Sequence, residues 1–322
     1  MKYKKIALIV PMLVMISTPA VFSPAVALAA EPTTSISQNQ TVLGYRIKDG
    51  IQTPIYPNGQ PKIKNFAQSG SPMPAVPTLP SDPNAAIPVK GEAVLETGEM
   101  GNMLYFDGSA GTSTKNEKLK FYLLKKDNGT IEYGGYNPDT FELYPFNVQA
   151  PQDDYGRPFD GNTKVKREVY YKKLGGGRQD NAFSYKFNEA IKHGVTTSNL
   201  FSFTGTVGWK LTVKAGGSVI PAEVTQEFST SLSTMYSHTI AVSDEQTITN
   251  EVTIGPVNNA SYSYPYYQTA VYQLMSPYTC NPGSGLQQFI NDHPEFGSLA
   301  HTVYEYKDNE YLSLVTPGSH TM

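Results

Sequence analysis

The side chains that could perform acid, base or metal chemistry are few and scattered in this sequence. Asp153 and Asp154 are adjacent in a Pro- and Gly-rich stretch, which suits either paired carboxylates or two solvated acids on a loop. Gly175–Gly177 lacks the Lys-Ser/Thr of a phosphate-binding loop, which favours a turn or hinge. The histidines without compact metal-ligand spacing are His193, His238, His293, His301 and His320. We therefore expect no enzyme activity, no cofactor and no metal site.

The N-terminus has the pattern of a secretory signal peptide. Three lysines, Lys2, Lys4 and Lys5, precede an apolar run from Ile6 to Phe22, and Ala27-Leu28-Ala29 fits a small-x-small cleavage site. A retained membrane anchor is the alternative, but Pro, Ser and Thr interrupt the apolar run. We expect residues 1–29 to be removed and the protein to be secreted.

The net charge and the cysteine content narrow the possible binding partners and the ways in which the fold can be stabilised. Loss of the three N-terminal lysines changes the formal net charge from −3 to −6, which does not favour binding to nucleic acid. Cys280 is the only cysteine, so no intramolecular disulfide can form. The mature fold must therefore rest on the core that roughly 290 residues can bury.

A long amphipathic ribbon over residues 201–243 is the pattern that points to function. Apolar or small residues occupy the odd positions from Phe201 to Val219, with Ser, Thr, Gly and Lys between them. After residues 220–223 the phase switches, and the larger apolar residues take even positions from Val224 to Val242. A period of two is typical of a strand with one apolar face. An arm of about nineteen residues would be ~63 Å long, well beyond an ordinary soluble strand.

The phase switch fits a hairpin. If a four-residue loop pairs Val219 with Val224, both apolar sets lie on one side of the ribbon. A tilted barrel strand needs ~9–11 residues to cross a bilayer, and each arm is longer than that. One hairpin cannot close a barrel, so several chains would each contribute two strands. We therefore predict an insertion hairpin over residues 207–236 in a homo-oligomeric transmembrane barrel.

The two faces of this hairpin are expected to have different roles. The residues expected to face lipid are Val207, Trp209, Leu211, Val213, Ala215, Val219, Ile220, Pro221, Val224, Phe228, Leu232 and Tyr236. The residues expected to line the lumen are Lys210, Thr212, Lys214, Glu227, Ser229 and Ser231. Interfacial aromatic residues are favoured at the ends of spanning segments, where Trp209 and Tyr236 fall.

The same alternation also fits a long hairpin in a soluble β-sandwich. The chain would then be a secreted carbohydrate- or receptor-binding module without pore activity. The length of the arms, a polar face made mostly of Ser, Thr and Gly, and export without disulfides favour insertion. Gln226 and Thr230 argue the other way, because they dilute the apolar face.

At these residues the chain resembles the aerolysin-type β-pore-forming toxins, and most closely the branch of clostridial epsilon-toxin and the mosquitocidal toxins. The resemblance rests on the run Val207–Pro221, on Val224–Ser233 and on the Ser/Thr-rich residues 237–254. It covers about residues 165–275. Where the family has a Val-Pro-Pro-like element, this chain has Ile254-Gly255-Pro256. The resemblance implies a soluble secreted monomer, activation by a host protease, and ring oligomerisation on a receptor at the target-cell membrane.

We accordingly expect a mainly β, elongated aerolysin-like fold of long antiparallel strands with an N-terminal head domain. The function expected is that of a cytolytic, insecticidal toxin. The expected regions are 1–29 (signal peptide), 30–164 (head, with the Pro-rich segment 71–88 as a linker or surface arm), 165–275 (pore-forming domain) and 276–322 (C-terminal segment).

The aromatic-rich stretch over residues 133–160 is the candidate receptor site of the head. Rings in such a stretch can stack on a glycan or a protein receptor, or can simply pack in a β core. The candidates for receptor binding are Tyr133, Tyr136, Tyr144 and Tyr155.

Overall fold

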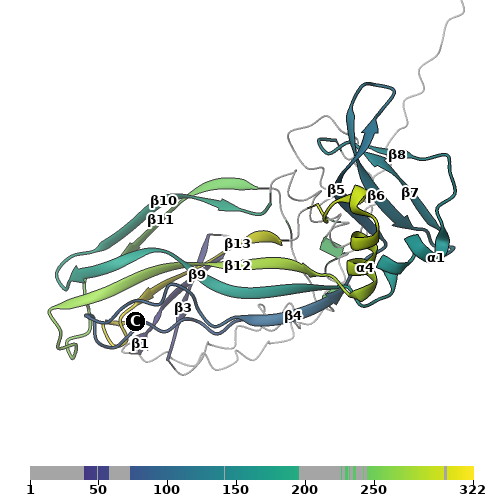
Figure 1. Cartoon of the computed structure of the whole chain (residues 1–322). Helices are drawn as coiled ribbons and strands as arrows, with labels where there is room; N and C mark the ends of the chain where they lie inside the picture. Colours follow the sequence, from purple (N-terminus) through teal and green to yellow (C-terminus); the bar gives the residue numbers. More distant parts are fainter. Residues whose placement is uncertain are drawn as a thin grey trace, which may run out of the picture. The chain divides into compact units, whose positions relative to one another are not determined.

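The computed structural model describes residues 40–48, 50–57, 73–140, 142–195, 245–300 and 303–322, and seven positions between 226 and 242. Most of the elements in these residues are strands (Figure 1). The strands are β1 (Thr41–Val42), β2 (Gly44–Lys48), β3 (Ile51–Ile55), β4 (Val94–Glu99), β5 (Met103–Thr112), β6 (Lys118–Lys125), β7 (Ile131–Tyr136), β8 (Leu143–Pro145), β9 (Lys164–Asp180), β10 (Tyr185–His193), β11 (Gln246–Ile254), β12 (Tyr266–Asn281), β13 (Val303–Val315) and β14 (His320–Thr321). The fully described helices are α1 (Gln152–Tyr155), α4 (Ser284–Asp292) and the 3-10 turns η1 (Arg157–Phe159) and η2 (Pro294–Phe296).

The expectation of a mainly β fold built from long antiparallel strands is confirmed. A six-stranded antiparallel sheet has the order β3-β2-β13-β12-β9-β4. Its central strands β9, β12 and β13 are 17, 16 and 13 residues long. A four-stranded meander joins β5 to β8, while β10–β11 and β1–β14 form separate pairs. The six-stranded sheet draws strands from each of the three regions expected after the signal peptide.

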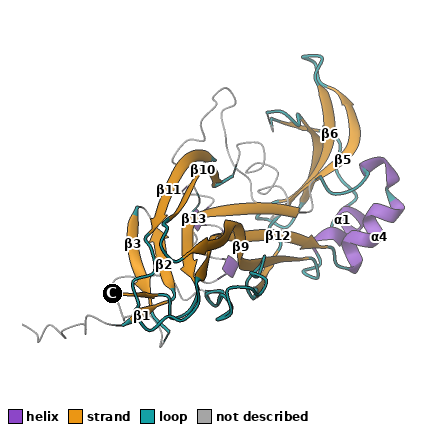
Figure 2. Ribbon diagram, turned by 90° about the vertical axis from the view of Figure 1, so that its left-hand side faces the viewer, coloured by secondary structure: helices purple, strands orange, loops and turns teal. Residues whose placement is uncertain are grey.

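The six-stranded sheet is covered on both faces. On β12, Ala270, Tyr272 and Leu274 belong to one buried cluster, while Tyr267 and Val271 belong to another. Because alternate residues of a strand point to opposite faces, these two clusters lie on opposite sides of the sheet. The second cluster contains Phe187, Ile191, Val252 and Ile254 of β10 and β11, which run beside the sheet in Figures 1 and 2. This double coverage explains why most of β12 is buried.

The Pro-rich segment packs against the opposite face of the sheet. Over residues 73–89 it is extended apart from turns near residue 83, and Leu79 is buried in the cluster of Tyr272. The Tyr272 hydroxyl donates a hydrogen bond to the Pro88 carbonyl at 2.7 Å. Gln268 Nε2 donates to the Ala85 carbonyl at 2.6 Å. An extended chain was expected here, but its part in closing the core was not.

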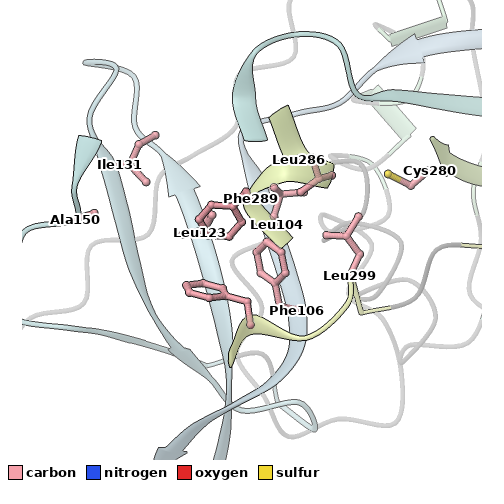
Figure 3. Close-up of a cluster of buried hydrophobic side chains, with 10 residues drawn as sticks. Leu104, Phe106, Leu123, Ile131, Ala150, Cys280, Leu286, Phe289 and Leu299 are labelled. Carbon is pink, nitrogen blue, oxygen red and sulfur yellow. The ribbon is translucent and has the colours of Figure 1, made fainter. Parts of the chain in front are cut away.

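The meander β5–β8 forms its own core with α4 and η2. Leu286 and Phe289 of α4 lie against Leu104 of β5 and Leu123 of β6 (Figure 3). Phe296 of η2 is stacked on Phe121 at 4.3 Å between ring centroids. Helix and turn from the C-terminal segment therefore complete the core of the head.

Two sequence signals had different outcomes. Asp127-Asn128-Gly129 is a hairpin turn signal, and a hairpin is present there between β6 and β7, with Lys126 N donating to the Thr130 carbonyl at 2.8 Å. The turn or hinge predicted at Gly175–Gly177 is wrong, because β9 runs through these residues with one register shift. Gly176 has φ 129°, and a Cβ there would lie 2.2 Å from the Thr269 carbonyl oxygen. Glycine is needed for the close approach of two strands, not to end one.

Candidate functional site

The ribbon β10–β11 marks both ends of the segment that contains the predicted hairpin. Its strands pair antiparallel from Tyr185 with Ile254 to His193 with Gln246. Beyond the ribbon, Glu245 N donates to the Val195 carbonyl at 2.6 Å. Val195 and Glu245, which flank residues 196–244, therefore lie next to each other.

All the described residues of the return arm except Val242 are helical, which differs from the strand predicted there. Gln226, Ser229, Thr230, Leu232, Met235 and Tyr236 all have helical conformation. Leu232 and Tyr236 are buried, whereas Gln226 and Thr230 are exposed. The physical reason lies in the spacing, because residues four apart share a helix face and also one face of a strand. The apolar residues with this spacing are Val224, Phe228, Leu232, Tyr236 and Ile240.

Met235 and Tyr236 of this helical stretch pack against strands β4, β9 and β12 of the six-stranded sheet. The Tyr236 hydroxyl donates to the Val165 carbonyl of β9 at 3.3 Å, and its ring lies 6.0 Å from that of Tyr278 on β12. Gly98 of β4 is buried beneath Met235, and a Cβ at Gly98 would lie 2.3 Å from Met235 Cγ. A larger residue at position 98 would therefore push the stretch away. We call Gly98, Val165, Arg167 and Tyr278 the docking site.

A buried ion pair forms the polar centre of the docking site. Arg167 of β9 stands directly opposite Glu96 of β4, and Nη1 donates to Oε2 at 2.6 Å. Their side chains are 10% and 11% exposed, so water screens the pair poorly. The guanidinium lies 6.0 Å and 5.9 Å from the ring centroids of Tyr236 and Tyr278. Burial raises the pKa of Tyr278 to about 12, so this hydroxyl stays neutral at physiological pH.

The sequence carried a signal for this site that the search for catalytic residues missed. On β9 the buried positions alternate as Val165, Arg167, Val169 and Tyr171. An arginine at a core-facing position needs a partner, and such an interruption of a strand pattern marks a buried ion pair. Glu96 supplies that partner from the neighbouring strand.

Most residues assigned to the insertion hairpin lie outside the described residues. Those expected to face lipid are Val207, Trp209, Leu211, Val213, Ala215, Val219, Ile220, Pro221, Val224 and Phe228. Those expected in the lumen are Lys210, Thr212, Lys214, Glu227 and Ser231. Ser229 is described, and its hydroxyl accepts a hydrogen bond from Val242 N at 3.0 Å.

The four head tyrosines are held in internal contacts. Tyr136 is 2% exposed and its hydroxyl donates to the Phe106 carbonyl at 3.3 Å, so a receptor cannot reach its ring without local opening. Tyr133 and Tyr155 are half-buried and lie 5.0 Å apart edge to face. The Tyr144 hydroxyl donates to Glu117 at 2.5 Å. Aromatic sequence alone does not distinguish core packing from a binding surface, and here the rings of Tyr133, Tyr136 and Tyr155 pack against other rings.

Asp153 and Asp154 lie in different environments. Asp153 is exposed, while Asp154 accepts hydrogen bonds from Arg157 and, at 2.8 Å, contacts Nε2 of His293. Partial burial alone would raise the pKa of Asp154, but the bonds from His293 and Arg157 hold it below its usual value. The cluster therefore clamps α1 and η1 to the end of α4.

A second polar cluster lies at the base of the ribbon β10–β11. The Tyr311 hydroxyl contacts the ring of buried His193, and Gln273 Nε2 donates to the Asp308 carbonyl at 2.8 Å. Register shifts here, because Gln273 pairs with Tyr311 but Met275 pairs with Lys307. The intervening residues of β13 include Asp308, whose pKa burial raises to about 6.

Across the described positions, no three His, Cys, Asp or Glu residues are placed to hold a metal ion. Likewise, none of the described helices is both long and apolar enough to cross a membrane.

No protein-family model and no curated protein matches this chain. Among solved structures it is similar to the crystal structure of Cry35Ab1, with 10% sequence identity and a TM-score of 0.31. The match covers 65% of this chain and 50% of the other, so the chain spans about half the length of that structure.

Proposed function

We propose that this protein is a secreted, aerolysin-like pore-forming toxin that stores its membrane-inserting segment on the docking site. After protease activation and binding to a receptor, copies of the chain oligomerise on the target-cell membrane. The segment over residues 207–236 then leaves the docking site and becomes a β-hairpin of a shared transmembrane barrel. Insect cells are the proposed targets.

The observation that carries this proposal is the register of the ribbon β10–β11. His193 pairs with Gln246, and the bond from Glu245 N to the Val195 carbonyl is one residue out of this register. If the register of β10–β11 were restored beyond that point, Phe203 would pair with Tyr236, and Val207 with Leu232. It would also pair Leu211 with Phe228, and Ala215 with Val224. Apolar residues would thus meet at every fourth position, as they also do in the register inferred from the sequence with a four-residue loop, while Trp209 would face Thr230 and Val213 would face Gln226.

The buried face of the ribbon is also continuous with the apolar face of the segment. On β10 the buried apolar residues are odd, Phe187 and Ile191, and on β11 they are even, Val252 and Ile254. The outgoing arm keeps its apolar residues on odd positions and the return arm keeps them on even positions. One face could therefore extend from the protein core into lipid without a change of phase.

The return arm has a sequence suited to two states. Its apolar residues recur every fourth position, which satisfies the helical seat of Leu232 and Tyr236 and also one face of a strand. The residues between them are mostly Ser and Thr, which have lower helix propensity than Ala or Leu. The helical state thus depends on contacts with the docking site, and loss of those contacts favours the strand.

Dye release tests the proposal. Protease-treated protein should release dye from vesicles made from insect gut membranes and should form a detergent-resistant oligomer on them. Replacement of Leu211, Val213 and Phe228 by Asn should abolish release while membrane binding persists. Binding without any release by the unaltered protein would instead support the secreted binding module.

A further inference from the structure

Two neighbouring loops carry an exposed aromatic surface far along the ribbon from the segment 196–244. The turn between β9 and β10 carries Phe183, which is 65% exposed, and the loop before β12 carries Tyr264, which is 39% exposed. Tyr266, at the start of β12, is also 39% exposed. We call these three residues the tip surface. Exposure of a large apolar ring is unfavourable in water, so a surface that gathers three of them is a candidate contact for a partner.

The tip surface is held rigid by hydrogen bonds between the two loops. Asn181 N donates to the Pro265 carbonyl at 3.1 Å, and Val257 N donates to the Asn181 carbonyl at 3.0 Å. The Tyr267 hydroxyl donates to the Phe183 carbonyl at 2.8 Å. A partner that binds here would therefore lose little affinity to ordering of the loops.

The chemistry of the tip surface fits an uncharged, hydroxyl-rich partner. Residues 255–265 contain no charged side chain, but they contain Ser261 and Ser263 in exposed positions. Arg178 and Asp180 border the surface. Arg178 lies 4.7 Å from the Tyr266 ring centroid and donates to Asn84 at 2.8 Å, while Asp180 accepts from Ala182 N at 2.9 Å. The Asp180 carboxylate would repel a lipid phosphate, and the remaining N–H groups of exposed Arg178 can donate to sugar hydroxyls.

We propose that the tip surface binds a neutral carbohydrate chain. The C–H groups on one face of a pyranose ring carry partial positive charge, and the faces of Phe and Tyr rings carry partial negative charge. Stacking on Phe183 and Tyr264 would bind the sugar face, and the side chains of Ser261 and Ser263 would bind its hydroxyl groups. The site is separate from the head tyrosines, and the proposal does not depend on pore formation.

Binding of neoglycoproteins tests this proposal without any leakage assay. Albumin carrying many galactose, N-acetylgalactosamine or mannose groups would be immobilised, because multivalency makes weak sugar binding measurable. Phe183→Ala/Tyr264→Ala should weaken binding at least about tenfold, while Tyr264→Phe, which keeps the ring, should retain most of it. If the double variant is unstable, the single variant Phe183→Ala replaces it in the binding test and should also weaken binding. The matched control is Val89→Ala/Leu95→Ala, which removes side chains that are 73% and 71% exposed elsewhere.

The proposal is supported if at least one sugar binds and only the tip variants lose it. It is overturned if the unaltered protein binds none of the three conjugates, or if the tip variants bind as well as the control. Binding through Phe183 and Tyr264 to sugar-free phosphatidylcholine vesicles, with no binding to the conjugates, would also overturn it and would assign the surface to lipid.

Discussion

Replacement of Asp308 by Asn should stabilise the protein at neutral pH and should have little effect at acid pH. Asp308 lies in β13, next to Lys307, which forms a β-bridge with Gly194 at the end of β10. Burial raises the pKa of this carboxyl group from 3.8 to about 6. Lys48 and Arg167 favour its ionised form, and Glu310 opposes it. Asn has nearly the same shape but carries no charge.

The sign and size of this stability change follow from the linkage between protonation of Asp308 and folding. Because the folded state holds the Asp308 proton more tightly than the unfolded state, stability falls as pH rises from about 4 to 6 and stays lower above that range. Each pH unit in that range is worth about 1.4 kcal/mol, so the ionised carboxylate costs at most about 3 kcal/mol. With allowance for solvent, we expect Asp308→Asn to add about 1–3 kcal/mol at pH 7.5, or about 2–8 °C in the melting temperature.

Thermal unfolding followed by circular dichroism between pH 4 and 8 measures this effect. The wild-type and variant curves should converge below pH 4.5 and separate above pH 6. Asp127→Asn, which changes an exposed carboxyl group in the β6–β7 turn, serves as the control and should leave the melting temperature unchanged. Equal stabilisation by Asp308→Asn at pH 4.5 and 7.5, or destabilisation at both, would refute the reasoning.

Three further predictions concern the docking site and the core. Glu96→Gln should destabilise the protein by about 3 kcal/mol, because Arg167 loses its carboxylate partner. Urea unfolding would measure this loss of stability. A loss below about 1 kcal/mol would contradict the prediction. Tyr236→Ala should remove about 3 kcal/mol of packing and make residues 226–242 more sensitive to limited proteolysis than in the wild type. Burial raises the pKa of the Cys280 thiol to about 11, so DTNB should label it at pH 8 only after unfolding.

Strand patterns allowed the fold class to be predicted, because alternation and turn residues act locally. The Asp127-Asn128-Gly129 turn between β6 and β7 is such a local signal. The return arm was assigned to the wrong local structure for this state, because a four-residue spacing fits both a helix and a strand. Only tertiary contact with Gly98 and Tyr278 decides between them.

The docking site and the head core could not be predicted from local patterns. Arg167 and Glu96 are 71 residues apart and meet only because β4 pairs with β9. Tyr136 follows the same strand pattern as an exposed aromatic residue would, but it is buried with Tyr105, Tyr122 and Ala300 in a cluster separate from that of α4. The residue types can be read directly, whereas the burial of each side chain depends on which distant segments cover its face of the sheet.

A disulfide that locks the helical stretch to the sheet tests the central claim most directly. A Cβ at Gly98 would lie 2.3 Å from Met235 Cγ, so the Cβ atoms of Gly98→Cys/Met235→Cys would lie within about 4 Å, a separation suited to a disulfide. Buried Cys280 should not compete for oxidation. Each single variant, with and without reductant, is the matched control. The oxidised double variant should bind membranes without releasing dye, and reduction should restore release. Equal dye release by the oxidised, crosslinked protein and the wild type would contradict the claim that this segment must leave its docking site.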